Sequence, residues 1–161
     1  MIIILFGKPG VGKNFVGDVM AKNFGFYHYD ADSDLPKYVV DKIKSGQLAT
    51  DEDREKFYDI VIDNIKKLKK SFKNIVVSQA LIKEKHRKML LEKLPSIKFL
   101  WLQADKDIMA KRLLDREHFV SKNYADELDN LFEQPKIVCD IIKNNSTEEA
   151  IINQLESILQ K

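Results

Sequence analysis

The sequence predicts an α/β fold in which one five-stranded parallel sheet is covered by helices on both faces. Apolar runs of strand length alternate with segments whose apolar residues recur with a helical period. The runs IIILF and FLWL are apolar at every position, which is typical of strands buried on both faces. Alternating strands and helices favour parallel pairing through right-handed crossovers. A length of 161 residues suits a single domain spanning 1–161.

The same patterns place the individual elements. We expect strands at Ile2–Phe6, Phe26–Asp30, Asn74–Ser78, Ile97–Leu102 and Lys136–Ile141. The clearest helix is predicted from about Asp51 to Lys70, and it starts with Thr50-x-x-Asp53, the pattern of a capping box. The last helix is predicted to begin at the similar pattern Ser146-x-x-Glu149.

One connection is predicted to be a lid. Between Asp115 and Pro135 the sequence is polar and shows no strong period. A connection of that length without secondary structure is unusual in a small α/β domain and is often functional. We therefore predict a lid over about 112–135.

The composition is that of an ordinary globular protein with nearly balanced charge. Apolar residues make up 44% and charged residues 32%, and the formal net charge of +2 indicates neither nucleic acid nor a membrane as a partner. The single cysteine, Cys139, excludes an internal disulfide. The apolar N-terminal run is shorter than the core of a signal peptide, and no stretch reaches the length of a membrane span. We expect a cytoplasmic monomer or homodimer.

A phosphate-binding loop is predicted directly after the first strand. Its sequence matches G-x-x-x-x-G-K and opens a predicted helix. In such a loop the glycines let successive backbone N–H groups point at phosphate oxygens, and the helix N-terminus adds positive potential. Lys13 would bring a full charge to the β- and γ-phosphates of ATP. The predicted nucleotide contacts here are Gly7, Lys8, Pro9, Gly10, Val11, Gly12, Lys13, Asn14 and Phe15.

Asn14 departs from the usual pattern of this loop, in which Ser or Thr ligates Mg²⁺. An amide oxygen can take that role, so we predict Mg²⁺ as a cofactor and Asn14 as a metal ligand. Weaker metal binding, altered nucleotide preference and a degenerate site stay open as interpretations.

An acidic turn follows the second predicted strand. It lies at the same carboxyl edge of the sheet as the phosphate loop, where open α/β folds bind ligands. Asp30 and Asp32 can therefore divide metal binding and proton acceptance between them. Asp34 directly precedes Leu35-Pro36 and is expected to cap the next helix instead.

The order of motifs over residues 1–135 resembles one family. After the phosphate loop come DADSDLP, SGQLATDEDR, SQALIKEKHR, RLLDREHF and EQP. This series is similar to the gluconokinase group of the shikimate-kinase-like P-loop kinases. The resemblance implies a P-loop fold like that of nucleoside-monophosphate kinases. It also implies transfer of the γ-phosphate of ATP to a hydroxyl of a small sugar acid, with gluconate first.

The resemblance also implies roles at the acceptor. Asp32 would receive the proton of the reacting hydroxyl, and Asp30 would serve the metal. Arg54 would hold the carboxylate of the sugar acid, since a guanidinium pairs with a carboxylate bidentately. Arg87 and His118 would complete the substrate contacts.

At the lid, the resemblance assigns Arg112 and Arg116 to the nucleotide phosphates, with Arg116 as a catalytic residue; Phe119 belongs to the same motif. Several departures weaken the choice of acceptor; among them, Leu35 replaces the family's histidine, and Arg87 aligns only with one inserted residue. A shikimate-type or nucleoside-monophosphate-type kinase stays open. A nucleotide-binding regulator without catalysis also stays open, because of Asn14.

Overall fold

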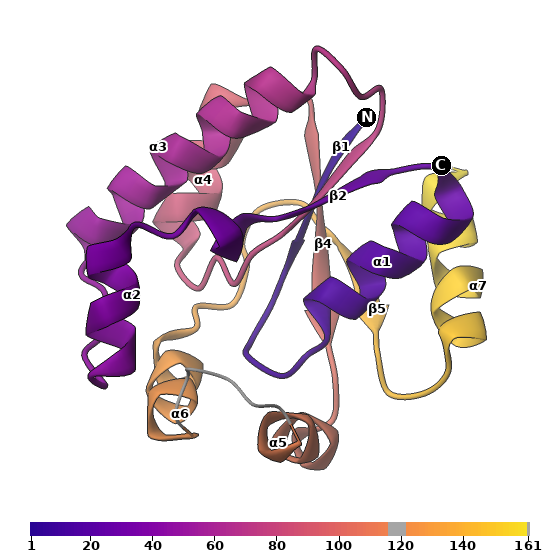
Figure 1. Cartoon of the computed structure of the whole chain (residues 1–161). Coiled ribbons are helices and arrows are strands. Elements are labelled where there is room, and N and C mark those ends of the chain that lie inside the picture. The colour runs from indigo at the N-terminus through magenta and orange to yellow at the C-terminus, as the bar shows by residue number, and fades with distance from the viewer. Residues whose placement is uncertain (116–121, 161) are drawn as a thin grey trace.

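The computed structural model describes residues 1–115 and 122–160 and confirms the α/β fold. Its sheet has five parallel strands in the order β2-β3-β1-β4-β5 (Figure 1). The strands are β1 Ile2–Phe6, β2 Tyr27–Asp30, β3 Ile75–Ser78, β4 Ile97–Gln103 and β5 Asp140–Lys143. The helices are α1 Lys13–Phe24, α2 Lys37–Lys44, α3 Asp51–Leu68, α4 Glu84–Lys93, α5 Lys106–Leu114, α6 Lys122–Leu131 and α7 Glu148–Leu159, with a 3₁₀ turn η1 at Ala31–Asp34.

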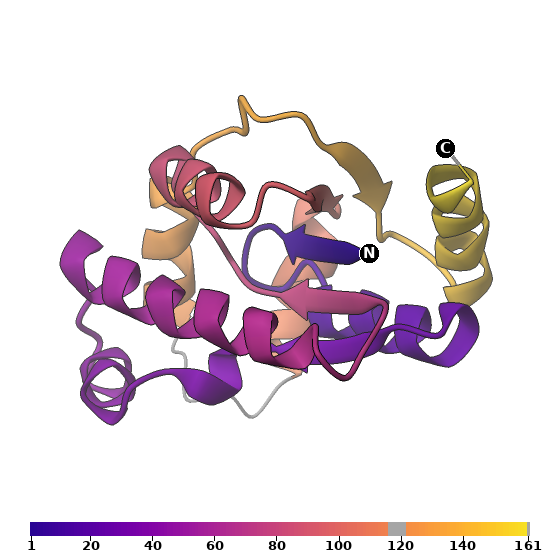
Figure 2. The ribbon, with the colours of Figure 1, turned by 90° about the horizontal axis from the view of Figure 1, so that it is seen from above.

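The sheet lies between two layers of helices. Helices α3 and α4 cover one face, and α1 and α7 cover the other (Figures 1 and 2). Strand β1 shows why, because its side chains alternate between the faces. Ile2, Ile4 and Phe6 belong to the core under α3 and α4, whereas Ile3 and Leu5 belong to the core under α1 and α7. All five are buried, so the apolar run correctly indicated a strand covered on both sides.

Side-chain caps fix the start of two helices. At α3 the predicted capping box is present: Asp53 N–H donates to Thr50 Oγ1 at 3.1 Å, and Thr50 N–H donates to Asp53 Oδ2 at 2.9 Å. At α7 the prediction was one residue early. Thr147, not Ser146, is the cap, and its hydroxyl accepts the Ala150 N–H at 3.3 Å.

The fifth strand is shifted from its predicted place. It was expected at 136–141, but pairing with β4 begins only where Asp140 lies opposite Leu100. Ile137 and Cys139 still pack against the core under α3 and α4, from a connection without ladder pairing. The run therefore marked a segment that packs only Ile137 and Cys139 on the core and exposes Val138, and not the hydrogen-bonded strand.

The prediction of a connection without secondary structure is wrong for 122–131, which form helix α6. Tyr124 and Leu128 lie one helical turn apart, and both are buried against Val39 and Ile43 of α2. Acidic residues surround these two apolar residues in the sequence. A single apolar pair at helical spacing in a polar segment is too short a pattern to indicate a helix. Residues 116–121 lie outside the described residues.

Three helices gather at one edge of the sheet. Helices α2, α5 and α6 lie beyond the carboxyl ends of the strands, where β1 passes into the loop before α1 (Figure 1). This is the edge at which parallel sheets bind ligands. Over the described ranges 1–115 and 122–160, no helix has the length and apolarity needed to span a membrane.

Candidate functional site

The predicted phosphate loop folds as a glycine-dependent turn between β1 and α1. Gly10 has φ 81° and Gly12 has φ 87°, a region that L side chains rarely adopt. An added Cβ at Gly12 would also lie 2.3 Å from the side-chain nitrogen of Asn144. Gly12 is the N-cap of α1, so the positive end of that helix faces the loop. The backbone geometry suits the binding of phosphate.

Lys13 folds back over the loop that precedes it. Its Nζ donates to the carbonyl oxygens of Gly7 at 3.1 Å and Lys8 at 3.2 Å. The charge is thereby held over the concave side of the loop, and Lys13 lines the adjacent cavity. Lys8 points elsewhere, because its ammonium pairs with Asp129 of α6 at 2.8 Å. Of the two lysines, Lys13 is the one placed to meet a phosphate in the cavity.

Arg112 and Asn144 brace the loop from behind. Arg112 Nη1 donates to the carbonyls of Gly10 at 3.4 Å and Val11 at 3.3 Å, and its Nη2 donates to the Asn144 carbonyl at 2.9 Å. The Asn144 amide donates to Val11 at 3.0 Å, while its buried Oδ1 has no partner among the described residues. Sequence reasoning placed Arg112 near the nucleotide loop but missed Asn144, because a single Asn after a strand carries no distinctive signal.

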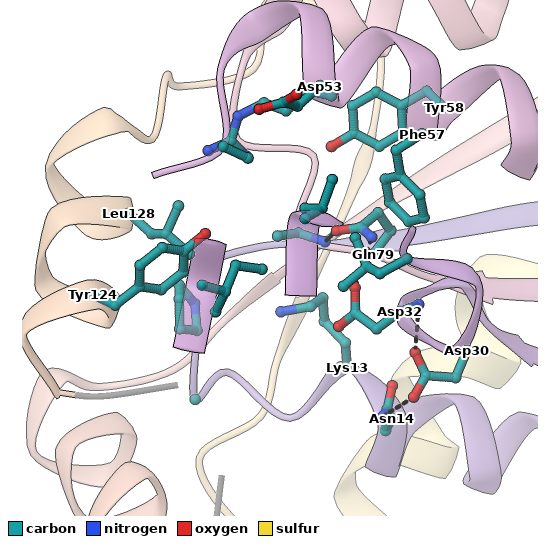
Figure 3. A pocket seen from close by; sticks show the side chains of 18 of the residues that line it. Lys13, Asn14, Asp30, Asp32, Asp53, Phe57, Tyr58, Gln79, Tyr124 and Leu128 are labelled. Carbon is teal, nitrogen blue, oxygen red and sulfur yellow. Dashed lines mark hydrogen bonds between the residues drawn. The ribbon is translucent and has the colours of Figure 1, made fainter. Parts of the chain in front are cut away.

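The predicted metal pair, Asn14 and Asp30, is brought together by a hydrogen bond within the pair. Asn14 Nδ2 donates to Asp30 Oδ2 at 2.7 Å (Figure 3), and Asn14 Oδ1 accepts from Ser78 Oγ at 2.6 Å. Ser78 is in turn 3.0 Å from His28 Nε2, and His28 Nδ1 is 2.8 Å from Asp18. This series of hydrogen bonds orients the Asn14 side chain so that its amide nitrogen, and not its oxygen, faces Asp30.

The oxygen donors at this edge fit Mg²⁺ bound through water and phosphate. Both Asp30 oxygens accept one hydrogen bond each, from Asn14 and from the Asp32 N–H, which leaves further lone pairs on the carboxylate. Mg²⁺ usually keeps several waters and takes few carboxylates. The described residues hold no group of three or more His, Cys, Asp or Glu arranged around a metal. Asn14 would ligate directly only after its amide rotated.

Asp32 lines the cavity and is oriented by Gln79. Gln79 Nε2 donates to Asp32 Oδ1 at 2.8 Å, and Gln79 Oε1 accepts the N–H of Ala80 (Figure 3). Gln79 is buried, so it holds the carboxylate from a fixed position at the end of β3. Its role was not predicted, although the residue stood inside the SQAL segment that resembles the family motif.

Asp34 does not cap α2, contrary to the expectation. The N-cap is Pro36, which makes no side-chain cap bond. The Asp34 carboxylate instead accepts hydrogen bonds from Tyr29 and from Asn64 of α3, the latter at 2.8 Å. Burial and the neighbouring Asp34 carboxylate raise the pKa of Tyr29. Asp34 therefore ties the turn η1 to α3 and points away from the cavity.

A cavity of about 280 Å³ joins the phosphate loop to the helices around it. One end, the nucleotide end, is formed by the loop and α1. The other, which we call the acceptor end, lies between Asp32, α2, α3, the segment after β3 and α6 (Figure 3). The lining residues at the acceptor end are Asp32, Leu35, Val39, Ile43, Ala49, Asp53, Arg54, Phe57, Tyr58, Gln79, Ala80, Tyr124 and Leu128.

Arg54 lies at the acceptor end, as its predicted role requires. Its Nη2 is buried and has no hydrogen-bond partner among the described residues. Tyr124 lies beside Arg54. Burial raises the pKa of the Tyr124 hydroxyl, although the nearby Arg54 charge and the Ala49 backbone act to lower it. A guanidinium with an unpaired nitrogen in a cavity wall can accept an anionic ligand.

Arg87 is not among the described residues that line the cavity. Its guanidinium is fully buried between the rings of Phe6 and Phe132, 4.9 and 5.0 Å from their centroids. Its nitrogens donate to three backbone carbonyls and to Glu84 at 2.9 Å. Arg87, which was predicted to bind substrate, thus lies in the core. There it joins the segment after β3 to the residues that follow α6.

Two further predicted contacts, Phe15 and Val11, are not among the described residues that line the cavity. Phe15 is an exposed residue of α1, and Val11 is packed in the core under α1 and α7. Arg116, His118 and Phe119 lie outside the described residues.

Comparison with known proteins identifies the family of this loop and sheet. The sequence profile of a family described as "AAA domain" matches residues 3–132. The chain belongs to this AAA-domain family. A "Probable gluconokinase" from Xenopus tropicalis is 27% identical to this chain. The match covers 97% of this chain and 92% of the relative.

Solved structures agree on the fold of the AAA-domain protein. A gluconokinase from Sinorhizobium meliloti matches 98% of this chain and 90% of its own at a TM-score of 0.82 and 22% identity. A shikimate kinase from Acinetobacter baumannii, in complex with shikimate, matches 99% and 93% at a TM-score of 0.68 and 16% identity. The predicted resemblance to gluconokinases is confirmed in sequence, and the fold is shared with gluconokinase and shikimate kinase structures.

Proposed function

We propose that this protein transfers the γ-phosphate of ATP, bound with Mg²⁺, to a hydroxyl of a small organic acid. The observation that carries the proposal is one cavity lined by Lys13, Asp32 and Arg54. A phosphate-binding cation, a carboxylate that can take a proton and a guanidinium that can hold an anion thus face one space. Nucleotide binding by P-loop kinases and the names of the relatives support the same reading.

The residues divide the reaction as follows. The loop N–H groups and Lys13 bind the β- and γ-phosphates and stabilise charge that develops on them. The acceptor oxygen bonds to the γ-phosphorus, the bond to the β–γ bridging oxygen breaks, and ADP leaves with that electron pair. Asp32, held by Gln79, receives the hydroxyl proton. Mg²⁺ would neutralise phosphate charge when bound, and Asp30 would hold it through water.

Gluconate is the reference acceptor, because the names of the relatives indicate it. A second candidate function rests on one observation: Asn14 turns its NH₂ toward Asp30 and its oxygen toward Ser78, which weakens the case for direct metal ligation. A regulator that binds nucleotide without phosphoryl transfer would tolerate this arrangement.

A panel of acceptors separates these functions. ATP binding is measured by calorimetry with and without Mg²⁺, and ADP release is then followed with gluconate, shikimate, AMP and neutral polyols. Acceptor-dependent ADP release confirms a kinase. Tight ATP binding with no release above the solvent background, for any acceptor, supports the regulator and contradicts phosphoryl transfer.

A further inference from the structure

Three polar side chains behind Asn14 have no part in the reaction proposed above: Asp18 of α1, His28 of β2 and Ser78 of β3. They reach Asn14 through a continuous series of contacts. Ser78 Oγ donates to Asn14 Oδ1 at 2.6 Å, and His28 Nε2 lies 3.0 Å from Ser78 Oγ. His28 Nδ1 lies 2.8 Å from Asp18 Oδ1. We call Asp18, His28 and Ser78 the support of Asn14.

The periods of helix and strand bring the support together. Asn14 and Asp18 are four residues apart, so they lie one turn apart on the same face of α1. His28 and Asp30 are two residues apart in β2 and therefore share a face of the sheet, and Asp30 lies opposite Ser78 in β3. Helix α1 packs against both strands. The contacts thus follow from the way in which α1 rests on the sheet.

A glycine inside α1 makes room for the His28 ring. Gly17 is buried, and a Cβ added to it would lie 2.3 Å from His28 Nε2 and 2.6 Å from two ring carbons. Glycine in the interior of a helix is less favourable than alanine, so this position loses helix stability and gains a close approach of the ring. The His28 side chain is 12% exposed, and Ser78 is buried. The ring therefore occupies a fitted place beside the Ser78 hydroxyl.

The directions of these hydrogen bonds favour one orientation of Asn14. Each end of the series is a carboxylate, Asp18 or Asp30, and a carboxylate only accepts. The Asn14 NH₂ therefore faces Asp30 (Figure 3), and the single hydroxyl hydrogen of Ser78 goes to the Asn14 oxygen. His28 Nε2 then donates to Ser78 Oγ. A turned amide would bring its oxygen to the Asp30 carboxylate and its NH₂ to the Ser78 hydrogen, and it would lose both contacts.

We propose that the support consists of positioning residues that hold Asn14 as a hydrogen-bond donor to Asp30 and keep its oxygen away from Mg²⁺. Outer contacts of this kind commonly orient the side chains around a metal. Asn14 then fixes the Asp30 carboxylate, which holds the metal through water. This inference rests on the proposed function for the metal, whereas the orientation of Asn14 does not require phosphoryl transfer.

The orientation is tested in the protein alone by ¹⁵N NMR. The side-chain NH₂ signals of Asn14 are assigned by their loss in Asn14→Ser, and their hydrogen exchange with solvent is compared with that of the exposed Asn153 side chain. The Asn14 hydrogen that binds Asp30 should exchange at least about 10-fold more slowly than those of Asn153. Equal exchange at the two side chains would overturn the inference.

Substitutions in the support separate orientation from packing. Ser78→Ala removes the donor to Asn14 Oδ1, and His28→Phe keeps a ring without nitrogens. Both should bring the exchange of the Asn14 amide close to that of Asn153. His28→Gln retains an N–H donor and should keep most of the protection, and Ser71→Ala, at an exposed turn, should change nothing. If His28→Phe and His28→Gln behave alike, the ring only fills space and the positioning role is contradicted.

A double-mutant cycle tests the fit between Gly17 and His28. In the parent chain Gly17→Ala should lower the urea midpoint and release the Asn14 amide, because the new methyl displaces the ring. In a His28→Ala background the same change should raise the midpoint, since alanine is the better helix residue. A midpoint raised equally in both backgrounds would mean that the ring does not occupy this place.

Mg²⁺ then tests the role of the orientation. Calorimetry follows the binding of a non-hydrolysable ATP analogue over a range of Mg²⁺ concentrations. Ser78→Ala should need roughly 10-fold more Mg²⁺ for half of the effect on affinity, because Asp30 loses its fixed donor, and Ser71→Ala should match the parent. In the parent, the Asn14 amide should exchange slowly with Mg²⁺ and analogue bound. Rapid exchange in that complex would mean that Asn14 turns its oxygen to the metal, and the inference would fail.

Turnover separates this inference from the proposed function. Loss of Asn14 protection in Ser78→Ala and His28→Phe, with no ADP release for any acceptor in the parent, supports the positioning role and contradicts kinase activity. Acceptor-dependent ADP release in the parent, with Asn14 protection unchanged in both variants, supports the kinase and overturns the positioning role.

Discussion

The two ends of the cavity are built from different parts of the chain. At the nucleotide end, residues 7–13 form one continuous turn, and its geometry follows from glycines at fixed spacing. At the acceptor end, side chains from η1, α2, α3, the segment after β3 and α6 converge across long sequence distances. A local motif can thus specify the shape of a phosphate-binding loop, whereas the shape of the acceptor end depends on tertiary packing that no single motif encodes.

The largest expected effect lies at the nucleotide end. Lys13→Ala should lower kcat on the order of 10²-fold or more, because it removes the charge aimed at the transferring phosphoryl group. Its thermal unfolding should stay close to that of the parent chain, since Lys13 lines the cavity and lies outside the apolar core clusters. Steady-state ADP release and a melting curve measure both effects.

The matched control for this change is Lys22→Ala, on the same helix, whose ammonium pairs with Glu148 at the surface. It should leave kcat unchanged. A Lys13→Ala enzyme with nearly normal kcat would contradict the assignment of the phosphate loop.

A smaller effect is expected at Asp32. Asp32→Asn should lower kcat roughly 10- to 100-fold with little change in the KM for ATP, because proton acceptance matters in the reaction and less in binding. The effect is limited because loose phosphoryl transfer requires little of a base before the late transition state. Asp41→Asn, at an exposed carboxylate paired with Lys37, is the control. A change confined to the KM for the acceptor, with kcat unchanged, would make Asp32 a binding residue.

Asn14→Thr sharpens the comparison at the edge between the two ends. Threonine removes the amide that binds Asp30 and supplies the hydroxyl usual at this position. We therefore expect half-maximal activity at a several-fold lower concentration of Mg²⁺. Titration of Mg²⁺ against both rate and ATP affinity by calorimetry tests this. If the variant needs an equal or higher concentration of Mg²⁺, Asn14 already serves the metal as well as threonine does.

The smallest expected effect concerns stability behind the acceptor end. His86 is buried next to the Tyr58 ring, its ring nitrogens have no hydrogen-bond partner among the described residues, and burial lowers its pKa from 6.5 to about 4. The unfolded chain therefore binds a proton between pH 6.5 and 4 that the folded chain does not. The free energy of unfolding should fall as pH falls through this window, by at most about 1.4 kcal/mol per pH unit.

Urea unfolding at several pH values compares the parent with His86→Met. The variant should show a shallower dependence on pH between 4 and 6.5. Lys88→Gln, at an exposed position of the same helix, should keep the parent's slope. Identical slopes in all three proteins would mean that His86 is accessible to protons in the folded state.

The sequence predicted those parts of the molecule in which local pattern and structure coincide. The phosphate loop and the cap at Thr50 are complete within a few residues, and β1 is apolar because both of its faces are covered. Where tertiary contacts decide, prediction failed. Arg87 matched a motif but lies in the core among carbonyls from distant segments. Helix α6 depends on two apolar residues that acquire meaning only against α2.

The ion pair between Lys8 and Asp129 has a consequence for the order in which ligands bind. It attaches the phosphate loop to α6, the helix that also carries Tyr124 and Leu128 of the acceptor wall. A nucleotide that shifts the phosphate loop would strain this attachment, and a ligand that presses on α6 would shift the same equilibrium. Since such coupling is reciprocal, each ligand must change the affinity for the other by the same factor. Ligands at the two ends of the cavity are thus expected to bind with synergy or antagonism, and not independently.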